Sequence, residues 1–130
     1  MLKVLILDDD RINNDLNVTV MKLTGLTDID VRVTGPGALQ YLDECCKKNV
    51  FPDLMFVDLS MPGMNGFTFI QEYEKIYRKF SKKTSIIFLT NSQLHEDKVR
   101  ALKHESVVDY IIKPLTIKKL IDVFQRVNAV

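Results

Sequence analysis

Acidic side chains follow two of the short apolar runs in this sequence. Residues 8–10 are all aspartate and come directly after Val4–Leu7, and Asp58 comes directly after Leu54–Val57. Carboxylates that are packed together repel one another and resist ionisation unless a cation lies among them. Mg²⁺ suits a cluster of carboxylate oxygens that leaves positions for water. We therefore expect a Mg²⁺ site if the fold brings these two segments together.

Two other apolar runs end in residues that bind anions. Thr90 follows Ile86–Leu89, and Lys113 follows Tyr110–Ile112. A hydroxyl and an ammonium opposite a bound cation would hold a phosphoryl group, whose transfer depends mostly on positioning and charge neutralisation. Each residue taken alone has a simpler explanation, as a helix cap or a solvated charge. The prediction of phosphoryl chemistry therefore rests on all four ends together.

The apolar runs themselves predict strands of a parallel sheet. They are short and do not alternate with polar residues, as expected of strands that are covered on both faces. The runs are Val4–Leu7, Val31–Val33, Leu54–Val57, Ile86–Leu89 and Tyr110–Ile112. Since ligands of open parallel sheets bind outside the carboxyl ends of the strands, the four reactive ends would share one rim if their strands are neighbours.

The segments between the runs carry apolar residues at helical spacing. Three stripes are clear: Ile12, Leu16, Val20 and Leu23; Phe69, Ile70, Tyr73, Ile76, Tyr77 and Phe80; and Ile117, Leu120, Ile121, Phe124 and Val127. Pro36 suits the first turn of another helix, Glu96–His104 indicates a weaker one, and Thr116 suits the cap of the last. A β–α unit repeated five times, with right-handed crossovers, predicts a doubly wound α/β domain with a five-stranded parallel sheet and helices on both faces.

Composition bounds the class of protein and its compartment. The 130 residues fit one domain, and a formal net charge of +1 gives no sign of binding to nucleic acid or a membrane surface. The apolar N-terminal run stops at Asp8, far short of a secretory core or a membrane span. Cys45 and Cys46 are adjacent and have no wider disulfide framework, as in proteins of a reducing compartment. We expect a cytoplasmic protein in which one of these cysteines packs on a helix as a small apolar side chain.

Four segments of the chain resemble the receiver domains of two-component response regulators, and the similarity covers essentially the whole sequence. The segments are Leu5–Asp10, Pro52–Gly66, Phe88–Thr90 and Tyr110–Pro114, and the most specific stretch is Asp58-x-x-Met61-Pro62-x-Met64-x-Gly66. The resemblance implies the flavodoxin-like, CheY-like strand order 2-1-3-4-5. It also implies a stand-alone receiver over residues 1–130, which acts as a regulator rather than an enzyme although it catalyses its own phosphotransfer and dephosphorylation.

The resemblance also assigns the chemistry residue by residue. Asp58 would accept a phosphoryl group from a phosphohistidine on a sensor histidine kinase or a histidine phosphotransfer protein. Asp9 and Asp58 would ligate Mg²⁺ directly, with the backbone carbonyl of Ser60 as a further ligand and Asp8 acting through water. Lys113 would pair with the phosphoryl oxygens.

A change of surface would follow phosphorylation. The resemblance implies that Thr90 hydrogen-bonds the phosphoryl group, that the peptide before Pro114 is cis, and that Tyr110 turns inward when the threonine moves. The fourth helix, fifth strand and fifth helix would then present an altered face to a protein target that the sequence does not identify. We expect a monomer or a weak homodimer, with no direct binding to nucleic acid or membrane.

Two other functions remain as alternatives. One is a receiver-like interaction module that works without phosphorylation, although every expected acceptor, metal-binding and lysine residue is present. The other, more distant, is a haloacid-dehalogenase-like phosphatase, because Asp8-x-Asp10, Thr90 and Lys113 echo three parts of such a site. That family needs a further acidic pair after the lysine, where this chain has only Asp122. A flavodoxin-like electron carrier is excluded, since the acidic end of the first strand would repel a flavin phosphate.

Overall fold

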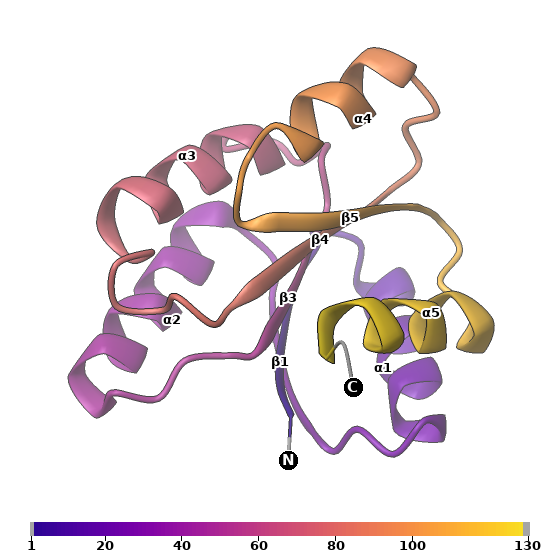
Figure 1. Ribbon diagram of the computed structural model, residues 1–130, viewed down its shortest axis with the longest axis horizontal. Coiled ribbons are helices and arrows are strands. Elements are labelled where there is room, and N and C mark those ends of the chain that lie inside the picture. Colours follow the sequence, from indigo (N-terminus) through magenta and orange to yellow (C-terminus); the bar gives the residue numbers. More distant parts are fainter. Residues whose placement is uncertain (1, 129–130) are drawn as a thin grey trace.

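Five parallel strands form the centre of the computed structural model, which describes residues 2–128 (Figure 1). The strands are β1 (Lys3–Leu7), β2 (Asp28–Arg32), β3 (Leu54–Val57), β4 (Ser85–Thr90) and β5 (Val107–Ile112). The helices are α1 (Arg11–Leu23), α2 (Gly35–Lys48), α3 (Gly66–Ile76), α4 (His95–Leu102) and α5 (Ile117–Asn128). The strand order is β2-β1-β3-β4-β5, which confirms the predicted doubly wound α/β fold.

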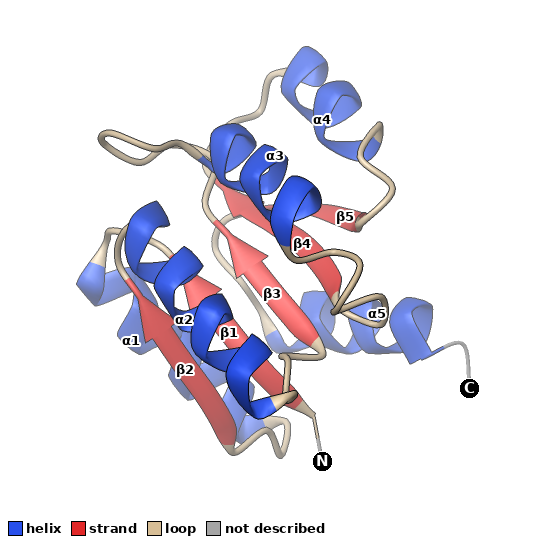
Figure 2. Cartoon of the chain, turned by 90° about the vertical axis from the view of Figure 1, so that its left-hand side faces the viewer, coloured by secondary structure: helices blue, strands red, loops and turns tan. Residues whose placement is uncertain are grey.

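Helices cover both faces of the sheet, with α2 and α3 on one side and α1 and α5 on the other (Figure 2). Successive side chains of a strand point to opposite faces. Leu5 of β1 therefore belongs to the core that contains Leu42 of α2, whereas Val4 belongs to the core that contains Met21 of α1. Burial on both faces explains why the central strands are apolar without alternation. The residues that follow these strands therefore stand at one edge of a well-packed sheet.

The two edge strands differ most from their predicted bounds. The apolar pattern predicts β2 over Val31–Val33, but the strand runs from Asp28 to Arg32. It predicts β5 from Tyr110, but the strand begins at Val107. An edge strand pairs on one side only and is partly exposed, so it tolerates charged residues such as Asp30 that hide it from an apolar pattern.

The predicted apolar stripe of α1 is wrong as a description of the buried face of this helix. Ile12, Leu16 and Leu23 are 76%, 61% and 69% exposed. Asp10 sets the phase of the helix as its N-cap, because its side chain accepts a hydrogen bond from the backbone N–H of Asn13 at 3.1 Å. With that phase, the side chains that α1 buries are those of Asn14, Asn17 and Met21. Ile12, Leu16 and Leu23 face solvent, whereas Val20 packs against the core. The exposed part of the stripe begins, at Ile12, close to the carboxyl end of β1.

α3 is shorter than its apolar stripe predicts. The helix ends at Ile76, and the chain then turns, which leaves Phe80 58% exposed. Tyr77 stays buried in this turn, and its hydroxyl donates a hydrogen bond to the Asp43 carboxylate of α2. Phe69, Ile70 and Tyr73 of the stripe are buried, whereas Ile76 at the end of the helix is 41% exposed.

The other predicted helices are also present in the structure. α2 has Pro36 in its first turn, and Thr116 accepts a hydrogen bond from the backbone N–H of Lys119 at 3.2 Å at the start of α5. α4 buries only Ala101 of its eight residues. Within residues 2–128, no helix combines the length and the apolar character that crossing a membrane requires.

Candidate functional site

The sheet brings three of the predicted acidic residues together at the carboxyl ends of β1 and β3. One carboxylate oxygen from each of Asp8, Asp9 and Asp58 lies within 4.8 Å of the other two. The two strands are neighbours, and the backbone N–H of Asp58 donates to the carbonyl of Leu7 at 2.8 Å. Asp8 and Asp58 are buried, whereas Asp9 is exposed. The cluster therefore has an open side through which a cation could enter.

Protein groups occupy both carboxylate oxygens of Asp8. Its Oδ1 accepts a hydrogen bond from the backbone N–H of Asp10 at 2.9 Å. Its Oδ2 accepts one from the side-chain amide of Asn13 at 3.0 Å and one from the ammonium of Lys113 at 2.7 Å. The side chain of Asn14 donates to the backbone carbonyl of Asp8 at 2.8 Å. These contacts fix the position of the Asp8 carboxylate within the acidic cluster.

Asn13 and Asn14 are residues of this cluster that sequence reasoning missed. Both lie in the first turn of α1, so their side chains can reach back to the end of β1. Their spacing of about one helical turn from the aspartates is the signal that could have found them. Asparagine near the start of a helix is more often a local cap, which hides a contact to a strand.

Few protein groups compensate the charge of Asp58. The ammonium of Lys113 lies 3.6 Å from its Oδ2, and the backbone N–H of Ser60 donates weakly to its Oδ1 at 3.5 Å. The pKa of the Asp58 carboxyl is raised to about 6, mainly by burial and then by the negative charge of Asp8, against the opposing effect of Lys113. A cation at the open side would stabilise the ionised carboxylate, so the residues present fit a Mg²⁺ site.

Thr90 and Lys113 bring the neighbouring strands β4 and β5 to the same edge. Thr90 is buried, and its carbonyl accepts a hydrogen bond from the backbone N–H of Lys113 at 2.8 Å. The Lys113–Pro114 peptide is cis, as the resemblance implies. The ammonium of Lys113 reaches into the acidic cluster, where it lies closer to Asp8 than to Asp58. All four predicted strand ends therefore contribute to one edge of the sheet.

Tyr110 connects to Thr90 through the loop between β4 and α4. The hydroxyl of Tyr110 donates to the backbone carbonyl of Ser92 at 3.0 Å, and the backbone N–H of Ser92 donates to Oγ1 of Thr90 at 3.2 Å. The Tyr110 ring is buried, with its centroid 6.3 Å from that of Phe88. The two predicted switch residues thus lie on one chain of hydrogen bonds.

Gly66 is needed because the backbone of Asp58 and Leu59 comes very close to it. A Cβ at this position would lie 2.5 Å from the carbonyl oxygen of Asp58 and 2.9 Å from the Cα of Leu59. The backbone N–H of Gly66 also donates to the carbonyl of Leu59 at 2.9 Å. The start of α3 is thereby held against Leu59, the residue that follows Asp58, and the exposed Ser60 comes next along the chain.

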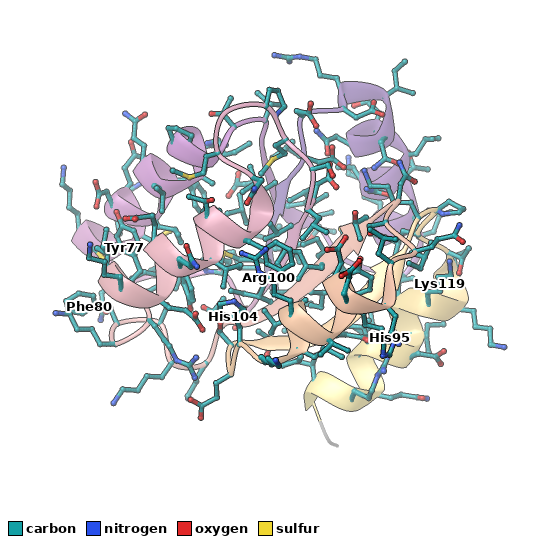
Figure 3. All side chains as sticks on the ribbon, turned by 90° about the horizontal axis from the view of Figure 1, so that it is seen from above. Tyr77, Phe80, His95, Arg100, His104 and Lys119 are labelled. Atoms are coloured by element: carbon teal, nitrogen blue, oxygen red, sulfur yellow. The ribbon has the colours of Figure 1, made fainter. Side chains whose placement is uncertain are left out.

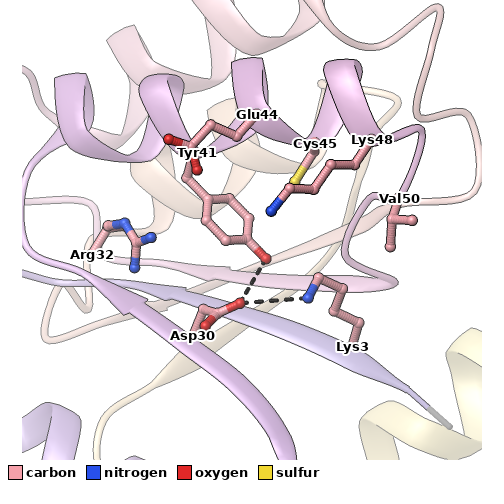
Figure 4. Close-up of a pocket in the computed structure, with 8 residues that line it drawn as sticks. All are labelled: Lys3, Asp30, Arg32, Tyr41, Glu44, Cys45, Lys48 and Val50. Atoms are coloured by element: carbon pink, nitrogen blue, oxygen red, sulfur yellow. Dashed lines mark hydrogen bonds and ion pairs between the residues drawn. The ribbon is translucent and has the colours of Figure 1, made fainter.

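A hollow of about 330 Å³ between β2 and α2 is lined by none of the predicted site residues (Figure 4). Asp30 holds two of its polar groups: the hydroxyl of Tyr41 donates to Asp30 at 2.9 Å, and the ammonium of Lys3 lies 3.5 Å from the same carboxylate. Cys45 also lines this hollow, and burial raises the pKa of its thiol. A thiol that stays protonated at neutral pH is a poor nucleophile, which agrees with the predicted packing role of the cysteine pair.

The family model of the response regulator receiver domain matches residues 4–125, a range that includes every predicted site residue. The chain belongs to this family. Receiver domains act as signalling regulators in phosphorelay systems, and they partner with histidine kinases or phosphotransfer proteins. The resemblance found in the sequence is therefore confirmed.

Other receiver-containing proteins are similar to the chain over nearly its whole length. The probable C4-dicarboxylate response regulator DctR of Halalkalibacterium halodurans is 28% identical over 121 residues, which cover 92% of this chain and 48% of the relative. The sensor histidine kinase CheAY of Helicobacter pylori is 29% identical over 123 residues, or 95% of this chain and 14% of the relative. The chain thus spans half or less of the length of these curated relatives. A solved two-component response regulator from Cytophaga hutchinsonii matches with a TM-score of 0.92 at 29% identity, covering 98% of this chain and 97% of that one.

Proposed function

We propose that this receiver domain is a Mg²⁺-dependent phosphoacceptor switch. Asp58 receives a phosphoryl group from a phosphohistidine on a sensor histidine kinase or a histidine phosphotransfer protein. The observation that carries the proposal is the position of Asp58, a buried carboxylate between an acidic cluster that attracts a cation and the ammonium of Lys113. A carboxylate so placed can act as a nucleophile while the charge of the incoming phosphoryl group is balanced from both sides.

The metal would be held on the open side of the cluster. Asp9, Asp58 and the backbone carbonyl of Ser60 would ligate Mg²⁺ directly, and Asp8 would orient a water. When bound, the ion neutralises charge on the phosphoryl oxygens. The exposure of Asp9 and Ser60 supports this assignment, because the ion must enter with part of its water shell.

The transfer step follows from the groups around Asp58. A carboxylate oxygen of Asp58 attacks the phosphorus while the P–N bond of the phosphohistidine breaks. The histidine nitrogen keeps the bonding electron pair and takes up a proton from solvent. Lys113 shifts from Asp8 towards the new phosphoryl oxygens, and Thr90 donates its hydroxyl proton to another of them. That proton is free for the purpose, since Oγ1 of Thr90 is the acceptor in its bond with Ser92.

The exposed stripe of α1 supports a docking site for the protein that carries the phosphohistidine. Ile12, Leu16 and Leu23 lie on one face of the helix, and the stripe starts beside the acidic cluster. Exposed apolar residues that form one patch commonly mark an interaction surface. We assign this stripe to a helix of the phosphodonor, because apolar ridges with this spacing pack against the grooves of another helix.

Phosphoramidate tests the chemistry, because it offers a P–N bond without a protein surface. We expect the intact mass of the protein to rise by one phosphoryl group with Mg²⁺ present, and to stay unchanged in EDTA or in Asp58→Asn. An adduct that forms without Mg²⁺, or that persists in Asp58→Asn, would overturn the proposal. If the wild-type chain formed neither this adduct nor a beryllofluoride complex, the phosphorylation-independent interaction module would replace it.

Leu16→Ala tests the docking site separately from the chemistry. The donor would be the member of a panel of phosphorylated histidine kinases and phosphotransfer domains that transfers fastest to the wild-type chain. We expect slower transfer from that donor to Leu16→Ala, with labelling by phosphoramidate unchanged. Ile121→Ala is the matched control, because Ile121 is an apolar residue of α5 that is 44% exposed. Equal transfer to both variants would contradict the assignment.

A further inference from the structure

Ser92 hydrogen-bonds to three elements that meet near the acceptor. Its backbone N–H donates to Oγ1 of Thr90 at 3.2 Å, at the end of β4. Its carbonyl accepts from the hydroxyl of Tyr110 in β5 at 3.0 Å. Its own hydroxyl donates to the carboxylate of Asp97 in the first turn of α4 at 2.6 Å. One loop residue therefore links the rim of the site, the buried tyrosine and a helix.

Polar contacts help to hold α4, which buries little of its own surface. The helix begins after Leu94, which makes no side-chain cap, and it buries only Ala101. The bond from Ser92 to Asp97 is one attachment of the first turn, and a hydrogen bond to a carboxylate is stronger than one between neutral groups. A second attachment is the guanidinium of Arg100, which lies 3.9 Å from the ring centroid of Phe67 in α3. Figure 3 shows the side chain of Arg100 between α4 and α3.

Asp97 also lies within electrostatic reach of the buried tyrosine. Burial is the main cause that raises the pKa of Tyr110, and the negative charge of Asp97 adds to it. The carboxylate is half-buried, which keeps solvent from screening it fully. The position of Asp97 is thus coupled to Tyr110 both through the backbone of Ser92 and directly through its charge.

We propose that Asp97 is a positioning residue of the switch, which ties α4 through Ser92 to Thr90 and Tyr110 so that all three respond together to phosphorylation. The inference rests on the proposed function, because the trigger is a phosphoryl group on Asp58. When the hydroxyl of Thr90 turns towards that group, its bond with the N–H of Ser92 changes. A movement of Ser92 displaces its carbonyl, which accepts from Tyr110, and its hydroxyl, which donates to Asp97, in the same step.

Amide NMR of the labelled full chain, with and without Mg²⁺ and beryllofluoride, tests this coupling. In the wild type we expect the amides of α4, of Tyr110 and of the residues around Asp58 all to shift. In Ser92→Ala and in Asp97→Ala the shifts around Asp58 remain, but those of α4 are lost. Glu96→Ala is the matched control, since it removes the neighbouring carboxylate of the same helical turn. It should respond as the wild type does.

Two results would overturn the inference. In the first, Asp97→Ala and Ser92→Ala both keep the α4 shifts of the control. In the second, Ser92→Ala loses the α4 shifts and Asp97→Ala keeps them. The coupling would then run through the loop without Asp97. Failure of the proposed function itself looks different, since no protein of the series would then shift around Asp58.

Discussion

Removing the charge of Asp58 should stabilise the metal-free protein at neutral pH. The carboxyl has a pKa of about 6 in the folded chain, against 3.8 for an ordinary aspartate. The folded state therefore binds this proton more tightly than the unfolded state, and stability is lost as the pH rises through that range. The difference between these two pKa values corresponds to about 3 kcal/mol of folding free energy at neutral pH. Because the cluster opens to solvent on the side of Asp9, screening leaves an expected gain of about 1–2 kcal/mol for Asp58→Asn.

Urea unfolding in EDTA measures this gain at about pH 7.5 and again at about pH 4.5. We expect the free energy of unfolding of Asp58→Asn to exceed that of the wild type at the higher pH, and the difference to shrink as the pH falls through 6. Mg²⁺ should also reduce the difference, because it binds the folded wild type. Asp122→Asn, at an exposed position of α5, controls for the loss of a surface charge. Equal stability, or a gain that does not depend on pH, would refute the reasoning.

Three further changes have defined outcomes. Gly66→Ala should lower the free energy of unfolding by about 1–3 kcal/mol, because its Cβ would lie 2.5 Å from the carbonyl oxygen of Asp58; a neutral effect on urea unfolding would contradict the close approach. Lys113→Ala should raise the pKa of Asp58 further in EDTA, since the ammonium now lowers it; a carboxyl ¹³C titration that shows no rise would count against this assignment. Tyr77→Phe should lower the free energy of unfolding by about 1 kcal/mol, because Asp43 loses a donor, while labelling by phosphoramidate stays unchanged; impaired labelling would show that this contact also matters to the site.

The central strands and the rim could be predicted because their signals are local. The predicted bounds of β3, Leu54–Val57, match the structure at both ends, since burial on both faces leaves an unbroken apolar run. Asp58 and Lys113 each stand directly after such a strand, so the parallel fold alone brings them to one edge.

The orientation of α1 could not be predicted from its apolar spacing. The spacing identifies a helix, but a stripe that faces solvent has the same period as one that faces the core. The cap at Asp10 and the hydrogen bond from Asn14 to Asp8 decide which side is buried. Both are polar contacts made at the start of the helix, and an apolar pattern does not record them.

The two hydrogen bonds that link Ser92 to Tyr110 and to Asp97 could not be predicted from the sequence either. Ser92 and Tyr110 are separated by α4 and the first half of β5, and their hydrogen bond depends on how the loop before α4 packs beside β5. The bond from Ser92 to Asp97 depends on the shape of the loop before α4. Neither residue pair has a spacing that marks it in advance.

Locating the phosphoryl group tests the central claim most directly. After Mg²⁺-dependent labelling with phosphoramidate, borohydride reduces an aspartyl phosphate to homoserine, and peptide mass spectrometry identifies the reduced residue. We predict homoserine at position 58 alone. Homoserine at Asp8 or Asp9, or labelled protein with no reduced aspartate, would contradict the assignment of Asp58 as the phosphoacceptor.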